Sequence, residues 1–364
     1  MRKIIFSLDW LLLLSTFLLT VIGVFMVFST SVGEVDQFSF VVRELVYILV
    51  GLFFGFLVIF LNYRFLLNSA WFLYSLLVLL LLVTFILGIE TRGSTRWIDF
   101  GFFTLQPSEL AKPVLTLTLT AFFLRFSPSK IRNVLLSLAL VLLPTLFIFV
   151  QPDLGSSLIL ALFWLGLIYV TGIKFRHFLA LLTFGLVSLP LIFNLLKDYQ
   201  KERLLSFLNP SVDPLGSGYN LVQSIIAVGS GQFLGRGFGR GTQSHLNFLP
   251  EQKTDFIFAT TAEELGFVGV LLILVLFGVL IWRLLSIGAS AQSRAGSFIC
   301  YGASLIIASQ VFVNAGMNMG LLPITGITLP FVSFGGSSLV SMMILIALAE
   351  SVHLHKKFGG FDQN

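Results

Sequence analysis

Long apolar runs recur along the whole chain and are separated by short polar segments. Each run approaches or exceeds the roughly 20 residues that an α-helix needs to cross the hydrocarbon core of a bilayer. The runs cover residues 8–29, 42–62, 69–89, 108–126, 133–151, 155–172, 177–196, 263–284, 297–317 and 336–353. They predict an all-α integral membrane protein with about ten transmembrane helices, organised as one polytopic membrane domain over residues 1–364.

The composition supports this class and excludes others. Hydrophobic residues make up 57% of the chain and charged residues only 11%, whereas an average soluble domain is about 25% charged. This shortage of charge excludes a soluble enzyme, a disordered chain and a fibrous protein. The net charge of +5 comes from dispersed bases, so nucleic acid is not expected as a partner. The single Cys300 lies inside an apolar run and is expected to act as a small hydrophobe.

The basic residues predict the orientation in the membrane. The short loops on one side hold only Arg92 and Arg96, and the other side is rich in bases, which marks it as cytoplasmic. An even number of spans then places both termini in the cytoplasm. Twelve of the 22 bases lie on that side: Arg2, Lys3, Arg64, Arg125, Lys130, Arg132, Lys174, Arg176, Arg283, Arg294, Lys356 and Lys357.

A long segment between the seventh and eighth spans, about residues 197–262, is predicted to be a large extracytoplasmic loop. Residues 219–228 carry apolar side chains at helical spacing, which predicts an amphipathic helix on the membrane or on the bundle. A Gly-rich stretch follows at 229–241. Glu263 and Glu264 are expected to open the eighth span, where acidic side chains complement the helix dipole. Long loops of this kind commonly carry function.

Glu109 and Lys112 form the first candidate group at the outer ends of the spans. They are three residues apart in the first turns of a predicted helix and therefore share a face. Two interpretations stay open. The pair can be purely structural, or Lys112 can be partly free to meet an anionic ligand.

The second candidate group is the Gly-rich stretch with Arg236 and Arg240. It has no Gly-Lys-Ser/Thr ending and no preceding strand, so it is neither a Walker loop nor a dinucleotide fingerprint. Glycines can expose backbone N–H groups to a phosphate. Two arginines could each add bidentate hydrogen bonds to the same phosphate. A flexible surface turn is the alternative interpretation.

Asp255 is the third candidate, because it lies among apolar residues at the predicted membrane boundary. Burial would raise the pKa of this carboxyl and a nearby cation would lower it; Lys253 and Lys112 are the candidate cations. A carboxyl tuned in this way suits a general base. A helix cap or an ordinary loop carboxylate is the alternative.

The segment 314–338 carries no charge at all, and its prolines and glycines interrupt any helix. Uncharged, broken backbone at membrane depth is tolerated only where protein buries it or where it lines a cavity. It is therefore predicted to form a re-entrant wall.

Five segments together resemble the SEDS family, named for shape, elongation, division and sporulation. They are RGSTRWIDFG…QPSELAK (92–112), QPDLGSS (151–157), GYNLVQSIIAVGSGQFLGRG (218–237), LPEQKTDFIFATTAEELGFVG (249–269) and NAGMNMGLLPITGITLPFVSFGGSS (314–338). The resemblance runs along nearly the whole chain in the same order. The short tails make the chain more similar to the elongation members (RodA) than to the division members (FtsW).

This resemblance implies a peptidoglycan glycosyltransferase that serves cell elongation and shape. It would polymerise lipid II, the undecaprenyl-pyrophosphate-linked disaccharide-pentapeptide, into β-1,4 glycan strands at the outer face of the bacterial inner membrane. The essential acid of the family's Thr-Asp-Phe motif falls on Asp255, and the preceding Pro-Glu on Pro250 and Glu251. Many members carry His where this chain has Lys253, which removes any role for an imidazole there. The implied partners are a class B penicillin-binding protein and other elongation proteins.

The implied reaction inverts the anomeric carbon, so Asp255 is expected to accept the proton of the acceptor 4-hydroxyl as a general base. The leaving pyrophosphate needs positive charge. A divalent cation such as Mg²⁺ or Mn²⁺ stays open as a cofactor, although no dense carboxylate cluster demands one. The candidate substrate and pyrophosphate residues are Lys112, Arg96, Arg236, Arg240 and Arg43, with the carboxylates Glu109 and Glu251.

A lipid II flippase without bond chemistry is the main alternative. Transporters commonly place polar groups at the bilayer midplane. This chain places its charges near the outer ends of its spans, which favours chemistry at one face.

Overall fold

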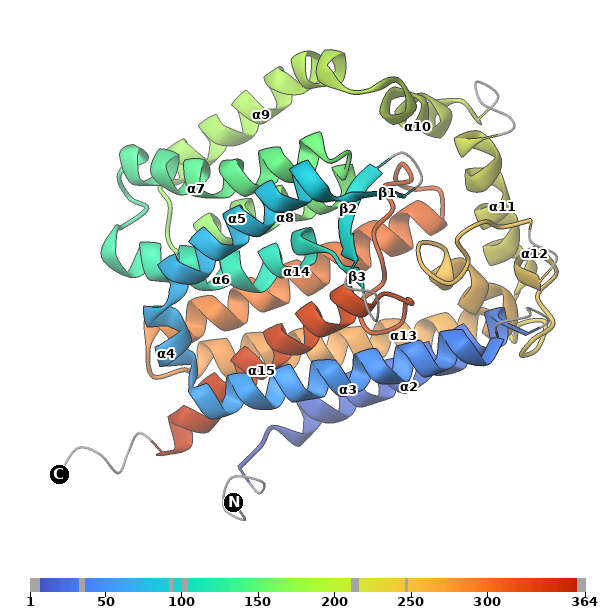
Figure 1. Cartoon of the computed structure of the whole chain (residues 1–364), viewed down its shortest axis with the longest axis horizontal. Coiled ribbons are helices and arrows are strands. Elements are labelled where there is room, and N and C mark those ends of the chain that lie inside the picture. Colours follow the sequence, from blue (N-terminus) through green and yellow to red (C-terminus); the bar gives the residue numbers. More distant parts are fainter. Residues whose placement is uncertain are drawn as a thin grey trace.

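The computed structural model describes residues 7–32, 37–91, 94–99, 104–210, 216–245 and 248–358. The chain folds into a bundle of long helices (Figure 1). The long helices are α2 (Trp10–Thr30), α3 (Gln37–Leu61), α5 (Ala70–Leu87), α6 (Pro107–Arg125), α7 (Ile131–Val150), α8 (Leu154–Val170), α9 (Phe175–Leu195), α13 (Ile257–Ala289), α14 (Arg294–Asn318) and α15 (Gly336–Phe358). The short ones are α4 (Tyr63–Asn68), α10 (Asp198–Leu208), α11 (Ser217–Ser230) and α12 (Thr242–His245).

The predicted class of a helical membrane protein is confirmed, and each predicted span falls on one of the long helices. Within the described ranges, seven helices are long and apolar enough to cross a membrane. They are α2, α3, α5, α7, α13, α14 and α15. The exact number of ten spans and the cytoplasmic side of the termini stay predictions.

A small antiparallel sheet is a feature that the sequence pattern did not predict. It consists of β1 (Ile89–Thr91), β2 (Ser94–Asp99) and β3 (Thr104–Leu105), in the order β1-β2-β3. Trp97 pairs with Ile89, and Asp99 pairs with Thr104. Strands β1 and β3 are too short to show an alternating pattern, and the residues of β2 do not alternate between apolar and polar. The sheet lies at the end of the bundle that also holds α10 and α11 (Figure 1).

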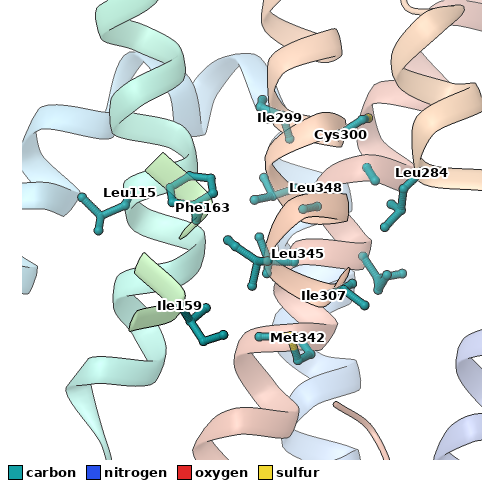
Figure 2. Close-up of a cluster of buried hydrophobic side chains, with 14 of the residues drawn as sticks. Leu115, Ile159, Phe163, Leu284, Ile299, Cys300, Ile307, Met342, Leu345 and Leu348 are labelled. Carbon is teal, nitrogen blue, oxygen red and sulfur yellow. The ribbon is translucent and has the colours of Figure 1, made fainter. Parts of the chain in front are cut away.

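The core lies where α6, α8, α13, α14 and α15 meet (Figure 2). Lipid tails are as apolar as these side chains, so close packing rather than the hydrophobic effect holds such helices together. Gly302 allows this approach, because a Cβ there would lie 2.9 Å from Thr116 Cγ2. Cys300 is fully buried in this cluster. The labelled core side chains include Leu115, Phe163, Leu284, Ile307 and Leu345.

Asp9 connects α2, α13 and α15 at the end of the bundle opposite the sheet. Its side chain caps α2 by accepting the Leu12 N–H at 3.1 Å, and it forms an ion pair with Arg283 of α13. Its own backbone N–H donates to Glu350 of α15 at 2.8 Å. The start of α2 and the last turns of α15 therefore lie at the same end, as an even number of spans requires.

The eighth span differs from its predicted bounds of 263–284. Helix α13 begins earlier, at Ile257, and its helical path breaks at Gly266, where φ is +68°. The loop before it is also more ordered than a simple connector, because it contains α10, α11 and α12. Helix α11 covers the predicted amphipathic stretch and packs on α13, with Leu221 and Ala227 buried.

Candidate active site

The Gly-rich stretch has a structural role at the break in α13. The break removes the helical bonds that the carbonyls of Glu263 and Glu264 would accept from residues 267 and 268. Those carbonyls accept instead from the N–H groups of Arg236 (2.9 Å) and Gly237 (3.0 Å). The freed N–H groups of residues 267 and 268 donate to the carbonyls of residues 232 and 233 at 2.9 and 3.2 Å. The stretch thus makes four backbone bonds in place of the two that the interrupted helix loses.

The side chains of Glu263 and Glu264 also bind this loop. The Glu263 carboxylate is fully buried and accepts four hydrogen bonds, from the N–H groups of Gln243 and Ser244 and from the hydroxyls of Thr242 and Ser244. It therefore caps α12. Glu264 accepts from the Ser29 hydroxyl at 2.6 Å and from the Gly239 N–H at 3.2 Å. The prediction that both acids open a span was wrong, because the helix begins at Ile257 and both carboxylates are held inside the protein.

Asp255 lies just before α13, where charged groups from distant parts of the chain converge. Glu251, Arg203 and Arg96 all act electrostatically on its carboxyl. Gly326 shows how closely the groups approach, because a Cβ at that position would lie 3.4 Å from Asp255 Oδ2 and 3.8 Å from Arg203 Nη1. Gly326 has φ +73°, a conformation that favours glycine.

The pKa of Asp255 is raised to about 6, first by burial and then by the negative charge of Glu251. Arg203, a hydrogen bond from Thr254 and Arg96 act in the opposite direction. Asp255 is consequently mostly ionised at neutral pH and can still accept a proton. Lys253 and Lys112, the candidate cations from the sequence, are not among the causes of this pKa shift. The Lys253 ammonium lies 3.7 Å from the centre of the Phe40 ring, and Lys112 pairs elsewhere.

Arg96 and Tyr199 are held against the turn that precedes α8. Arg96 donates its Nε–H to the Gln151 carbonyl at 3.1 Å and bonds the Pro152 carbonyl through Nη2. The Tyr199 hydroxyl donates to the same Pro152 carbonyl at 3.1 Å. The Arg203 guanidinium lies 5.9 Å from the Tyr199 ring centre. Strand β2 and helix α10 thus bring two guanidinium groups to the side of Asp255.

The uncharged segment between α14 and α15 forms a wall of this site. The Phe334 N–H donates to the Lys253 carbonyl at 2.8 Å, and the Ser333 hydroxyl donates to the Thr254 carbonyl at 2.6 Å. These bonds fix the backbone immediately before Asp255. The segment is non-helical, and its residues are mostly buried or half-buried, as backbone of this kind must be where it meets a membrane.

Glu109 and Lys112 are both buried in α6 and form an ion pair of 2.6 Å. Lys112 is only 1% exposed. The Glu109 backbone carbonyl also accepts a hydrogen bond from the Ser341 hydroxyl of α15 at 2.7 Å. In this arrangement Lys112 is paired rather than free.

We predict that Lys112→Met lowers the free energy of unfolding by about 3 kcal/mol, because it leaves the Glu109 carboxylate buried without its partner. Thermal unfolding in detergent measures this loss, and Glu109→Gln combined with Lys112→Met should recover much of it. Unchanged stability together with lost lipid II binding would instead show that Lys112 serves the ligand.

The remaining sequence candidates lie at the surface. Arg236, Arg240 and Arg43 are all exposed. Arg236 donates from Nε to the Ser230 carbonyl of its own loop at 3.4 Å. Their guanidinium groups can meet anions from solvent, but they are not among the charges that act on Asp255.

Arg203 and Tyr199 are site residues that the sequence reasoning missed. Arg203 was visible only as one base in a long loop. The available signal was the helical segment 198–208, in which positions 199 and 203 are one turn apart and share a face.

A cavity of about 590 Å³ lies apart from this site. Its walls come from α2, α3 and α15 and are almost entirely apolar, with Phe17, Leu52 and Met343 among them. It suits a hydrocarbon chain rather than a sugar or a phosphate.

These features define a polytopic membrane protein with a charged site at one end of its helix bundle. The model of the cell cycle protein family that comprises FtsW, RodA and SpoVE matches residues 9–358. The chain therefore belongs to the FtsW/RodA/SpoVE family, as its motifs indicated.

Individual relatives agree with this assignment. The chain is 42% identical over 288 residues to the peptidoglycan glycosyltransferase MrdB of Escherichia coli K12, covering 79% of this chain and 78% of the relative. It matches a chain of a peptidoglycan synthase complex with a TM-score of 0.82 and 31% identity, over 98% of this chain and 99% of the other. The rod shape determining protein RodA of Thermus thermophilus matches with a TM-score of 0.72 and 28% identity, over 96% and 97%.

Proposed function

We propose that this chain is a peptidoglycan glycosyltransferase that polymerises lipid II by an inverting displacement with Asp255 as the general base. The observation that carries the proposal is one carboxyl with a pKa of about 6, placed beside two arginines at the end of a membrane bundle. Family membership and the names of the relatives support the reaction. Removal of a proton from the acceptor hydroxyl suits a base of this pKa.

In the proposed reaction, Asp255 accepts the proton of the acceptor 4-hydroxyl as its oxygen attacks the anomeric carbon of the donor. The bond from that carbon to the pyrophosphate breaks, and the pyrophosphate leaves as an anion. Arg203 and Arg96 are the cations nearest to this chemistry, and guanidinium groups bind phosphates in bidentate fashion. Arg236, Arg240 and Arg43 stay as outer candidates. The polyprenyl tails need apolar surface, which the cavity between α2, α3 and α15 offers.

The described residues contain no group of three or more His, Cys, Asp or Glu that could hold a metal ion. Mg²⁺ is commonly bound by one or two carboxylates together with substrate phosphates, so Asp255 and Glu251 would suffice only for an ion that the substrate pyrophosphate also binds. A divalent cation bound jointly with the substrate pyrophosphate stays a separate proposal, which activity in the presence of a chelator tests.

We predict that kcat/KM rises with pH through a midpoint near 6, since only the ionised form of Asp255 can accept a proton. Glu251→Gln should move this midpoint to lower pH, because the negative charge of Glu251 raises the pKa of Asp255. Glu202→Gln, at an exposed acid of α10, is the matched control. A midpoint that stays in place in the Glu251 variant would refute the coupling.

Liposomes that contain the purified chain and lipid II separate the two candidate functions. A glycosyltransferase yields glycan product, and a flippase yields lipid II accessible on the other leaflet without new glycosidic bonds. Translocation without polymer would overturn the proposed function.

We place the chain in the bacterial inner membrane, with the site on the extracytoplasmic face, because lipid-linked precursors are polymerised there. A class B penicillin-binding protein is the proposed partner. The peptidoglycan synthase complex that this chain resembles supports such a partner. Polymerisation assays with and without the transpeptidase test whether it activates the chain.

A further inference from the structure

Two buried asparagines of α14 converge on the backbone carbonyl of Asp255. The side-chain nitrogens of Asn314 and Asn318 each lie 3.0 Å from this oxygen. Both side chains are fully buried. They lie about 60 residues away in the sequence, on the same face of α14 and one turn apart.

The Asn318 side chain replaces a backbone hydrogen bond that an uninterrupted helix would form between residues 259 and 255. In an uninterrupted helix, the Ala259 N–H would donate to the Asp255 carbonyl four residues earlier. Here the Asn318 amide takes both groups: its nitrogen donates to the Asp255 carbonyl, and its oxygen accepts from the Ala259 N–H at 3.2 Å. The first helical bond of α13 consequently runs one residue later, from the Thr260 N–H to the Phe256 carbonyl.

Asn314 connects the same carbonyl to the wall of the site. Its side-chain nitrogen also lies 2.6 Å from the Ile327 carbonyl, next to Gly326, which approaches the Asp255 carboxylate. One amide group therefore sets the position of the Asp255 backbone relative to the segment against which its carboxylate lies.

We propose that Asn314 and Asn318 are positioning residues that keep Asp255 outside α13 and aim its carboxylate at Arg203 and Gly326. The proposal rests on the proposed function of Asp255. Loss of the Asn318 amide would let the Ala259 N–H and the Asp255 carbonyl bond to each other. That change extends α13 toward its N-terminus and turns the Asp255 side chain away from the site.

Further hydrogen bonds within the protein hold the Asn318 side chain and backbone in place. The Asn318 nitrogen also donates to the Asn314 carbonyl at 2.8 Å, and the Ser224 hydroxyl of α11 donates to the Asn318 carbonyl at 2.9 Å. Such preorganisation matters because a displacement of about 1 Å of a catalytic group can cost about 100-fold in rate.

Asn318→Leu tests the proposal, because leucine has a similar shape and makes neither bond. We expect kcat for lipid II polymerisation to fall about 10- to 100-fold, with KM little changed and the midpoint of the pH profile displaced. Gln310→Leu is the matched control. Gln310 is a buried amide of the same helix, and its side-chain oxygen has no hydrogen-bond partner. Wild-type kcat and midpoint in folded Asn318→Leu would overturn the proposal.

Asn314→Leu provides the same test in a variant that keeps the Asn318–Ala259 bond, and it decides the question if Asn318→Leu does not fold. A readout without turnover separates this proposal from the proposed function. Infrared difference spectra against Asp255→Asn follow the titration of the Asp255 carboxyl itself. A displaced midpoint in the variants supports the positioning role even if Asp255 is not the base, and an unmoved midpoint refutes it.

Discussion

Replacing Asp255 with Asn should lower the rate of lipid II polymerisation by about 10²–10⁴-fold, the usual contribution of a positioned general base. Asparagine retains the size of the side chain but cannot accept the proton of the attacking hydroxyl. The loss should appear in kcat, because the proton moves only in the transition state. Glycan length and yield from purified lipid II measure it directly.

Two controls make this result specific to the chemistry. Asp198→Asn changes an exposed acid in the first turn of α10 and should polymerise as the wild type does. Thermal unfolding and lipid II binding of Asp255→Asn should match the wild type, since Asn314 and Asn318 hold residue 255 through its backbone carbonyl, which the variant retains. If Asp255→Asn binds lipid II and polymerises it at the normal rate, Asp255 is not the base.

Glu263→Ala should destabilise the protein by about 5 kcal/mol or more. The carboxylate accepts four hydrogen bonds in a fully buried position. Each buried donor left without an acceptor costs about 1–3 kcal/mol. The change would also remove the cap of α12 and loosen the loop that replaces the backbone bonds of broken α13. Thermal unfolding in detergent checks the expected drop.

Glu202→Ala, at an exposed acid, is the control and should leave the unfolding temperature unchanged. Glu263→Gln retains one acceptor oxygen and should fall between Ala and wild type. A Glu263→Ala protein as stable as the wild type would contradict the structural role of this carboxylate.

The Gly-rich stretch shows why local patterns can mislead. Its glycines and arginines look like a surface that offers N–H groups to a phosphate. Those N–H groups instead satisfy the carbonyls of Glu263 and Glu264, which the break at Gly266 had freed. A sequence does not reveal which acceptor a backbone donor will find, because that acceptor lies about 27 residues away along the chain.

The cations beside Asp255 could not be predicted from their positions in the sequence. Proximity in sequence suggested Lys253 as the cation beside Asp255, yet Lys253 lies over the Phe40 ring. Arg203, 52 positions from Asp255, and Arg96, farther still, take that place. A one-turn offset between residues can be computed from sequence, whereas the meeting of β2, α10 and the loop before α13 depends on how the whole bundle packs.

The sequence by itself determined the class of this protein, the approximate spans and the family motifs, and it singled out Asp255 as the candidate base. These follow from local properties, because a bilayer requires about 20 apolar residues per span and a scarcity of charge makes each remaining charge conspicuous. Only the tertiary structure decided which arginines approach Asp255, that Lys112 is paired with Glu109, and that Asn314 and Asn318 hold the Asp255 carbonyl. Those contacts are set by helix packing and by the need of every buried backbone group for a partner, which no stretch of sequence specifies alone.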